Sequence, residues 1–251
     1  MIYTKQTKEA MKLCFDFHKD QVDKGGMPYV FHPWYVADQM ETETETVTAL
    51  LHDTIEDGLD MDTLRAANIN PWAFRAILAI TRKKSETYAE YIDRVTHNIT
   101  AARVKRQDLL HNMDTSRLPE GKTVSLERYK NAYNKIVDST DYIIPITHIW
   151  TETFNKPTQG TALFEAIQSH KNEHPIQLVK LPSDLEEIEE AFMGTFVNLL
   201  VEEYGSITPE KIRIYVPGKP HLTQKFENAI QNRISVPAYE LIESAIAEFN
   251  Q

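Results

Sequence analysis

Apolar residues in the first 140 positions recur three and four residues apart, which is the spacing of one face of an α-helix. The first helix shows the pattern clearly, with an apolar face formed by Ala10, Leu13, Cys14 and Phe17. No useful length of this stretch alternates apolar and polar residues with the period of two that a half-buried strand requires. The pattern therefore predicts that the N-terminal part is all-α.

Turn-forming residues divide this part into further helices. Pro33 suits the first turn of the second helix, and the threonine- and glutamate-rich segment 41–46 leads into a third helix expected over 47–56. The remaining helices are expected at about 60–67, 71–82, 86–97, 100–113 and 124–140.

The pattern changes after residue 141. A short apolar run occupies 143–146, the segment 155–160 is a candidate loop, and strand-like runs cover 176–181 and 212–216. A long helix is expected between these strands, with Ser183 and Glu186 as its capping residues. Two more helices are expected near 220–233 and 237–249. We predict a mainly α fold, with an all-α helical bundle domain over 1–145 and a small α/β or α+β domain over 146–251.

Composition narrows the classes of protein. The net charge of −10 argues against an extended basic face for nucleic acid. No run of about 18 apolar residues predicts a membrane span, and the N-terminus does not resemble a signal peptide. A single cysteine, Cys14, excludes an internal disulfide. We expect a cytoplasmic protein, and the sequence is compatible with a homo-oligomer.

Candidate metal-binding and catalytic groups stand out against the helical background. They are His32, the pair His52–Asp53, the pair Glu56–Asp57, and Asp108. Residues four apart on a helix share a face, so Glu56 is expected beside His52. Asp57 is expected beside Asp53 in the same way. Ionisable groups that follow the apolar run 49–51 on a half-buried helix are costly unless they are paired or bound to metal.

The candidate ligands suit a divalent ion. Two imidazoles and two carboxylates are typical of Mn²⁺, Fe²⁺ or Zn²⁺ sites, and four protein ligands would leave positions for water and a phosphate oxygen. Glu56 and Asp57 could then move a proton. Each feature also has an ordinary explanation, because His-Pro commonly starts a helix and a lone helical aspartate is commonly solvated. The residues alone leave both interpretations open.

Longer motifs carry a resemblance to a known family. HKDQVDKGGMPYVFHPWYVA, ALLHDTIEDG, ILAITRKKSETYAEYIDRV and VKRQDLLHNMDTSRL follow one another in this order. Over roughly residues 5–140 they resemble the HD hydrolase domain of RelA/SpoT-type enzymes. The order and spacing are more specific than any single motif, and they favour the metal site.

The resemblance implies a role for each matched position. His32, His52, Asp53 and Asp108 match ligands that usually hold Mn²⁺; Fe²⁺, Zn²⁺ and Mg²⁺ are other candidates. The implied reaction is hydrolysis of a guanosine 3′-pyrophosphate, with release of pyrophosphate, for which Glu56 and Asp57 match the catalytic pair. Asn112 matches a contact to the substrate ribose or phosphate, and Lys24 matches a basic residue near the nucleotide. No synthetase half is apparent.

Several positions are assigned from the residues themselves. Arg82, with Lys83 and Lys84, is a candidate for phosphate binding, although a solvated helix end explains these cations equally well. His111, three residues after Asp108, is expected to support the site or the core.

Three functional interpretations follow. The first is a (p)ppGpp 3′-pyrophosphohydrolase. The second is an HD phosphohydrolase that acts on another nucleotide, a dinucleotide or a nicotinamide cofactor phosphate, and Asp23 favours it, because the family commonly has arginine there. The third is a nucleotide-sensing regulatory module, against which the intact Glu56–Asp57 pair argues. The expected partner is a small-molecule nucleotide in every case. The role of the domain over 146–251 is not indicated by any motif.

Overall fold

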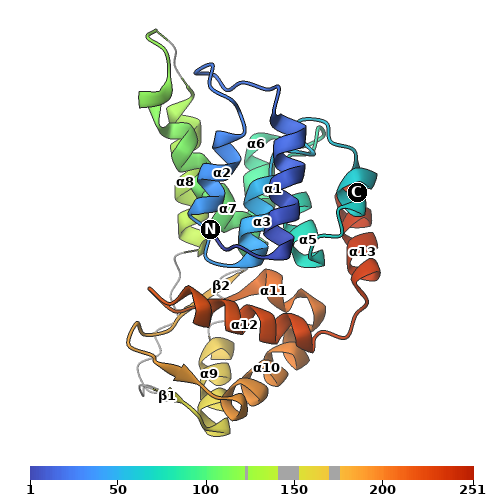
Figure 1. Ribbon diagram of the computed structural model, residues 1–251. Coiled ribbons are helices and arrows are strands. Elements are labelled where there is room, and N and C mark those ends of the chain that lie inside the picture. The colour runs from blue at the N-terminus through green and yellow to red at the C-terminus, as the bar shows by residue number, and fades with distance from the viewer. Residues whose placement is uncertain (122–123, 141–152, 170–175) are drawn as a thin grey trace. The chain divides into compact units, whose positions relative to one another are not determined.

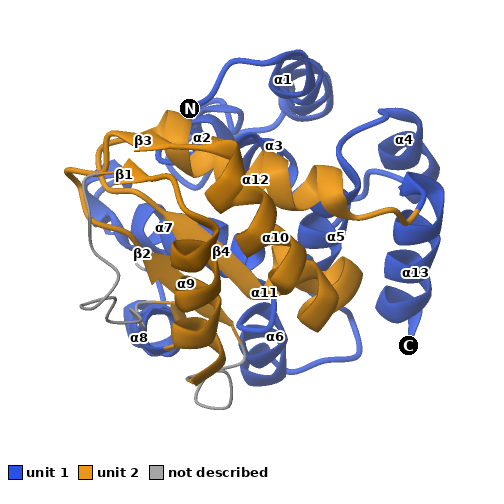
Figure 2. Ribbon diagram, turned by 90° about the horizontal axis from the view of Figure 1, so that it is seen from below, with its two compact units in different colours: residues 1–138, 237–251 blue, residues 139–236 orange. Residues whose placement is uncertain are grey.

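A computed structural model describes residues 1–121, 124–140, 153–169 and 176–251 (Figure 1). The fold is mainly α, with a small α/β part toward the C-terminus, as predicted. The chain forms two compact units, one of residues 1–138 with 237–251 and the other of residues 139–236 (Figure 2). We call them unit 1 and unit 2.

Unit 1 is a bundle of helices. Its elements are α1 (Lys5–His18), α2 (Phe31–Asp38), α3 (Glu43–Leu51), α4 (Met61–Ala66), α5 (Pro71–Ile80), α6 (Tyr88–Val95), α7 (Ile99–Met113), the 3₁₀ helix η1 (Thr115–Arg117), most of α8 (Leu126–Thr140), and α13 (Ala238–Asn250). α3 is the central helix and packs against α1, α2, α5 and α7 (Figure 1).

α3 begins earlier and ends earlier than predicted. Thr42 and Glu45 form a capping box, so the threonine- and glutamate-rich segment is the start of the helix. Glu45 is buried, and the guanidinium of Arg103 donates to it at 2.6 Å. The helix ends at Leu51, and the chain continues through turns to Gly58, which has a positive φ of 110°. His52 and Asp53 therefore follow the helix instead of lying within it.

Unit 2 combines short parallel strands with helices. Its elements are β1 (Thr153–Phe154), α9 (Pro157–Ser169), β2 (Gln177–Lys180), β3 (Glu187–Ile188), α10 (Glu190–Tyr204), η2 (Gly205–Ile207), α11 (Thr208–Lys211), β4 (Ile212–Tyr215) and α12 (Pro220–Arg233). β1 pairs with β3 and β2 with β4, both in parallel. The core of unit 2 contains a phenylalanine cluster from β1, α10 and α12, with members Phe154, Phe192, Phe196 and Phe226.

Two sequence predictions for this unit are wrong. The segment 155–160 was expected to be a loop, but α9 starts within it at Pro157, a residue that the first helical turn tolerates. The long helix starts at Glu190, with Glu189 as its N-cap, and not at the Ser183–Glu186 pattern. The strands β2 and β4 confirm the two strand-like runs, whereas the apolar run 143–146 lies outside the described residues.

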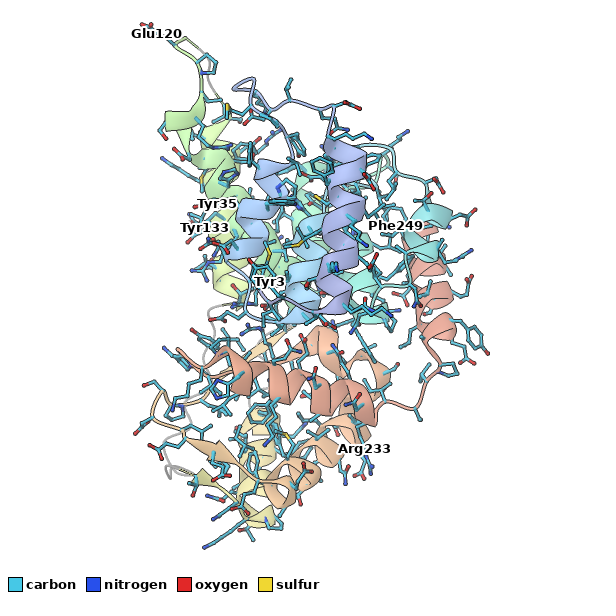
Figure 3. The ribbon with its side chains drawn as sticks, viewed as in Figure 1. Tyr3, Tyr35, Glu120, Tyr133, Arg233 and Phe249 are labelled. Atoms are coloured by element: carbon cyan, nitrogen blue, oxygen red, sulfur yellow. The ribbon has the colours of Figure 1, made fainter. Side chains whose placement is uncertain are left out.

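The chain leaves unit 1 and returns to it. The predicted boundary at residue 145 falls within 141–152, outside the described residues. The helix predicted over 237–249 is α13, and it packs against α5 in unit 1. Two side chains of the α5 region contact α13. Arg75 donates to Glu248 at 3.1 Å. The Lys83 ammonium lies 5.5 Å from the ring centroid of Phe249, which is labelled in Figure 3.

Within the part of the chain that the structure describes, no helix has the length and apolar character needed to cross a bilayer.

Candidate metal centre

Three packed helices of unit 1 bring the predicted metal ligands together. His32 lies in the first turn of α2, His52 directly follows α3, and Asp108 lies on α7. These helices contact one another pairwise. The donor atoms of His32, His52 and Asp53 all lie within 4.8 Å of one another.

Asp108 completes the cluster of donor atoms. Its Oδ1 is 3.1 Å from Nε2 of His32 and 3.8 Å from Nε2 of His52. Oδ2 of Asp53 is 3.6 Å and 3.1 Å from the same two nitrogens. The structure thus places two imidazole nitrogens and two carboxylate oxygens around one point.

The spacing suits a shared cation. Two donors each about 2.1 Å from an ion would lie about 3.0 Å apart at right angles and about 3.4 Å apart at the tetrahedral angle. The four distances, from 3.1 to 3.8 Å, match or slightly exceed these values. A modest contraction would therefore allow all four donors to reach one divalent ion.

The two ring nitrogens of His52 differ, because in the described part of the chain one is hydrogen-bonded and the other is not. Its Nδ1 lies 2.7 Å from the carbonyl oxygen of Ala49, one of the terminal carbonyls of α3. Because Nδ1–H donates there, Nε2 is the nitrogen that would offer its lone pair to a cation, after losing any proton that it carries. This Nε2 is buried and makes no hydrogen bond to the described residues. A buried ring nitrogen that faces two carboxylates in this way fits a metal ligand.

Additional side chains bind the two carboxylates. The Tyr29 hydroxyl donates to Oδ2 of Asp53, and the Asn112 amide donates to Oδ1 of Asp108. The Lys105 ammonium lies 2.7 Å from Oδ2 of Asp108. These contacts fix the orientation of both carboxylates, which is the usual role of groups behind metal ligands.

The charges of the cluster shift its pKa values strongly. Burial opposes the charge of His52, but the carboxylates of Asp53 and Asp108 outweigh it and raise the pKa of His52 to about 10. Burial also opposes ionisation of Asp108, yet Lys105 and His32 hold the pKa of that carboxyl well below its usual range. The pKa of Asp53 is lowered against the effect of burial, mainly by His52. Both carboxylates are therefore ionised at neutral pH.

The predicted catalytic pair lies on the turns after Asp53. Glu56 and Asp57 are both exposed. Oε2 of Glu56 accepts from the backbone N–H of Arg82 at 3.3 Å, and Oδ2 of Asp57 is 3.9 Å from Nδ1 of His18. Partial desolvation, together with the charge of Asp53, raises the pKa of Glu56 and that of Asp57.

The predicted substrate contacts lie in three places. Asn112 is in the cluster, through its bond to Asp108. Arg82 is exposed, and its backbone N–H donates to the carboxylate of Glu56. Lys24 is exposed in the loop between α1 and α2. The structure thus brings Asn112 to the predicted ligands and Arg82 to the predicted catalytic pair, and it places Lys24 on a neighbouring loop.

Asp23, which departs from the family pattern, has structural partners. Its Oδ1 accepts from the backbone N–H groups of Gly25 and Met27, at 2.8 and 2.9 Å, and so closes the loop. Its Oδ2 lies 3.3 Å from the Arg117 guanidinium. The negative charge that would repel a polyphosphate is thus paired with a cation.

Tyr29, Lys105 and Arg117 are site residues that sequence reasoning missed. Lys105 had a detectable signal, because it lies three residues before Asp108 on the same helix. Tyr29 and Arg117 reach their partners across the fold, so no local spacing indicated them.

The site is a histidine and aspartate cluster of the kind that holds a divalent ion. No family model matches the chain. Part of it is 30% identical over 126 residues to a GTP pyrophosphokinase of Myxococcus xanthus, which covers 43% of this chain and 17% of that protein. A putative chloroplastic GTP diphosphokinase of Oryza sativa subsp. japonica is 29% identical over 143 residues, or 47% of this chain and 16% of that protein.

The chain therefore spans about a sixth of the length of these curated relatives. The expected resemblance to RelA/SpoT-type proteins is confirmed for part of the chain.

Proposed function

We propose that the chain is a metal-dependent phosphohydrolase of the HD type, most like a guanosine 3′,5′-bis(diphosphate) 3′-pyrophosphohydrolase. The observation that carries this proposal is the convergence of four donor atoms on one point, with the buried Nε2 of His52 among them. The partial similarity to proteins named for GTP pyrophosphate transfer supports a nucleotide as the substrate.

The four ligands would hold Mn²⁺ in this proposal, with Fe²⁺, Zn²⁺ or Mg²⁺ as alternatives. When bound, the ion would acidify a water molecule and polarise a phosphorus centre. A hydrogen bond to the Ala49 carbonyl holds the imidazole of His52 in place, and a hydrogen bond from Tyr29 holds the carboxylate of Asp53. The Lys105 ammonium holds the carboxylate of Asp108, so this chain provides a preorganised site.

Glu56 and Asp57 would act as the general acid–base pair, which accepts and returns a proton during hydrolysis. They follow the ligand Asp53 by three and four residues, on exposed turns where water and substrate can reach them. Their raised pKa values bring each carboxyl closer to the range in which it can accept and return a proton. The Arg82 backbone would orient Glu56, and Lys24, Arg82 and Asn112 would contact phosphate or ribose.

A second candidate is hydrolysis of another nucleotide or cofactor phosphate at the same site. Asp23 favours this candidate, because it stands where the family commonly has an arginine. Its carboxylate pairs with Arg117 and accepts from the loop backbone, so this position offers no cation to a guanine nucleotide. A sensor that binds nucleotide without turnover is the remaining alternative.

The test is incubation of the purified protein with Mn²⁺ and a panel of phosphates, with chromatographic separation of the products. The panel is guanosine tetraphosphate, GTP, ATP, a dinucleotide and a nicotinamide cofactor phosphate. We expect pyrophosphate release from guanosine tetraphosphate. Turnover of a different member alone would establish the second candidate. Tight binding without any turnover would overturn hydrolysis in favour of a sensor.

The catalytic pair is tested by the isosteric double variant Glu56→Gln/Asp57→Asn. It should lower the turnover of the active substrate by about 10²–10⁴-fold, the usual contribution of general acid–base catalysis. The matched control Asp16→Asn/Asp20→Asn removes the same charge from exposed positions and should turn over normally. Wild-type turnover in the Glu56/Asp57 variant would remove both residues from the mechanism.

A further inference from the structure

The imidazole of His111 on α7 lies directly behind that of His32. Their Nδ1 atoms are 2.6 Å apart, and the two rings are nearly parallel, with an interplanar angle of 13°. The ring centroids are 4.9 Å apart, which exceeds the Nδ1–Nδ1 distance by 2.3 Å, or about two ring radii. The Nδ1 atoms therefore point at each other in a head-on hydrogen bond.

Only one of the two nitrogens can carry the shared proton. Nε2 of His32 faces Asp53 and Asp108, where the proposed metal would need its lone pair. A neutral imidazole with its lone pair on Nε2 has its proton on Nδ1, so His32 is the donor and His111 is the acceptor.

His111 is itself held in place. The ring of Tyr35, which is labelled in Figure 3, stacks on it, with centroids 4.2 Å apart and planes at 21°. Its backbone carbonyl accepts from the Arg117 guanidinium at 2.7 Å, and the same guanidinium pairs with Asp23. Asp23 and Arg117 thus connect the loop between α1 and α2 to the group behind His32.

We propose that His111 is a positioning residue, which fixes the tautomer and the orientation of His32 by accepting its Nδ1–H. The proposal rests on the metal site of the proposed function. His111 does not touch the metal, and its effect passes through His32.

Two variants separate hydrogen bonding from packing. His111→Phe keeps an aromatic ring against Tyr35 but cannot accept a hydrogen bond. His111→Gln loses the ring but offers a carbonyl oxygen to Nδ1–H of His32. If His111 acts as an acceptor, Gln should preserve metal binding better than Phe, and a packing role predicts the opposite order.

The measurement is Mn²⁺ affinity, followed by electron paramagnetic resonance of the free ion. We expect about 10–100-fold weaker binding in His111→Phe, the usual effect of losing a group behind a metal ligand. His111→Gln should bind within about threefold of wild type. Equal affinity in wild type and His111→Phe, or weaker binding by Gln than by Phe, would overturn the proposal.

A tautomer measurement gives a readout that packing does not move. In the zinc-loaded protein, long-range ¹H–¹⁵N correlation should show His111 protonated on Nε2, which leaves its Nδ1 as the acceptor facing Nδ1 of His32. Protonation of His111 on Nδ1 in that state would contradict the proposal. The control His221→Gln, at an exposed histidine of unit 2, should bind Mn²⁺ as wild type does. Failure of the wild type to bind any divalent ion would instead overturn the proposed function.

Discussion

Cys14 shows how strongly the interior of unit 1 controls a single side chain. The thiol is fully buried on α1, and burial, with a further contribution from the charge of Asp53, raises its pKa to about 12. At pH 8 only about one molecule in 10⁴ would carry the thiolate, which is the reactive form. Cys14 is thus buried in the core and stays in its unreactive thiol form.

We therefore expect Cys14 to resist thiol reagents in the native protein. Labelling with a disulfide reagent at pH 8 should be at least about 10³-fold slower than for an exposed thiol, because exposure requires unfolding. In about 6 M guanidinium chloride, where the protein is expected to be unfolded, the same reagent should label one thiol per chain. Rapid native labelling would show that α1 opens locally.

The candidate metal centre was predictable to the extent that its ligands follow local spacing. His52 and Asp53 are adjacent, and the apolar run before them indicated burial. The hydrogen bond from Tyr29 to Asp53 and the ion pair of Arg117 with Asp23 depend on tertiary packing, which no spacing encodes. The roles of the ligands and of the catalytic pair stay predictions.

The C-terminal end of α5 depends on a side chain from the next helix. Arg94 of α6 donates to the carbonyl oxygens of Leu78, Ala79 and Thr81, at 3.3, 2.7 and 2.8 Å. Glu86 holds the guanidinium with contacts of 2.5 and 3.0 Å. Since the last carbonyls of a helix have no partner within it, Arg94 serves as the cap that links α5 to α6.

Replacing this cap should destabilise unit 1. Arg94→Met keeps the aliphatic part of the side chain, but it removes the donor to the three carbonyls and the cation beside Glu86. We expect a loss of about 2–4 kcal/mol in the free energy of unfolding, measured by urea denaturation. Lys135→Met, which breaks an exposed ion pair with Asp93, is the control and should cost less than about 1 kcal/mol.

The same pair should give stability that depends on pH. Burial favours protonation of Glu86, but Arg94 outweighs it and lowers the pKa of Glu86 below its usual range. A carboxyl whose pKa is lower in the folded state stabilises the fold above its unfolded pKa of about 4.3, and this contribution disappears as the pH falls further. The stability difference between wild type and Glu86→Gln should shrink between about pH 6 and pH 3. A difference that stays constant would exclude the ion pair as its source.

Helix positions were predicted best where strong signals agreed. Asn70–Pro71 marked the start of α5 correctly, since the Asn70 side chain caps the helix and Pro71 is its first residue. Polar capping residues were misread at α3, because Thr42 and Glu45 look like a linker unless their reciprocal bonds are known. Pro157 looked like part of a loop for a similar reason. The two-residue strands β1 and β3 are too short to show any periodicity.

Unit 1 is assembled from two separate stretches of chain. Residues 1–138 need α13 to cover one side of α5, and Arg65 adds an ion pair of 2.8 Å with Glu243. Leu241 and Ala245 of α13 are both buried. A fragment that ends near residue 145 would therefore lack a helix that belongs to the unit with the candidate metal centre.

Truncation after Val236 should destabilise unit 1, although it leaves the candidate ligands untouched. Losing the burial of Leu241 alone should cost about 1.5–3 kcal/mol. Thermal unfolding followed by circular dichroism should show a lower Tm, and removal of only the exposed Gln251 is the control. An unchanged Tm after truncation would mean that α13 contributes no net stability.

The discontinuity of unit 1 also has a consequence for synthesis on the ribosome. Residues 237–251 are translated after residues 139–236, so the surface of α5 that α13 covers must wait for its partner. At about 5–20 residues per second, this delay lasts roughly 5–20 seconds. During that interval the nascent chain exposes apolar surface beside a largely complete bundle, and this is the stage at which a chaperone would protect it from aggregation.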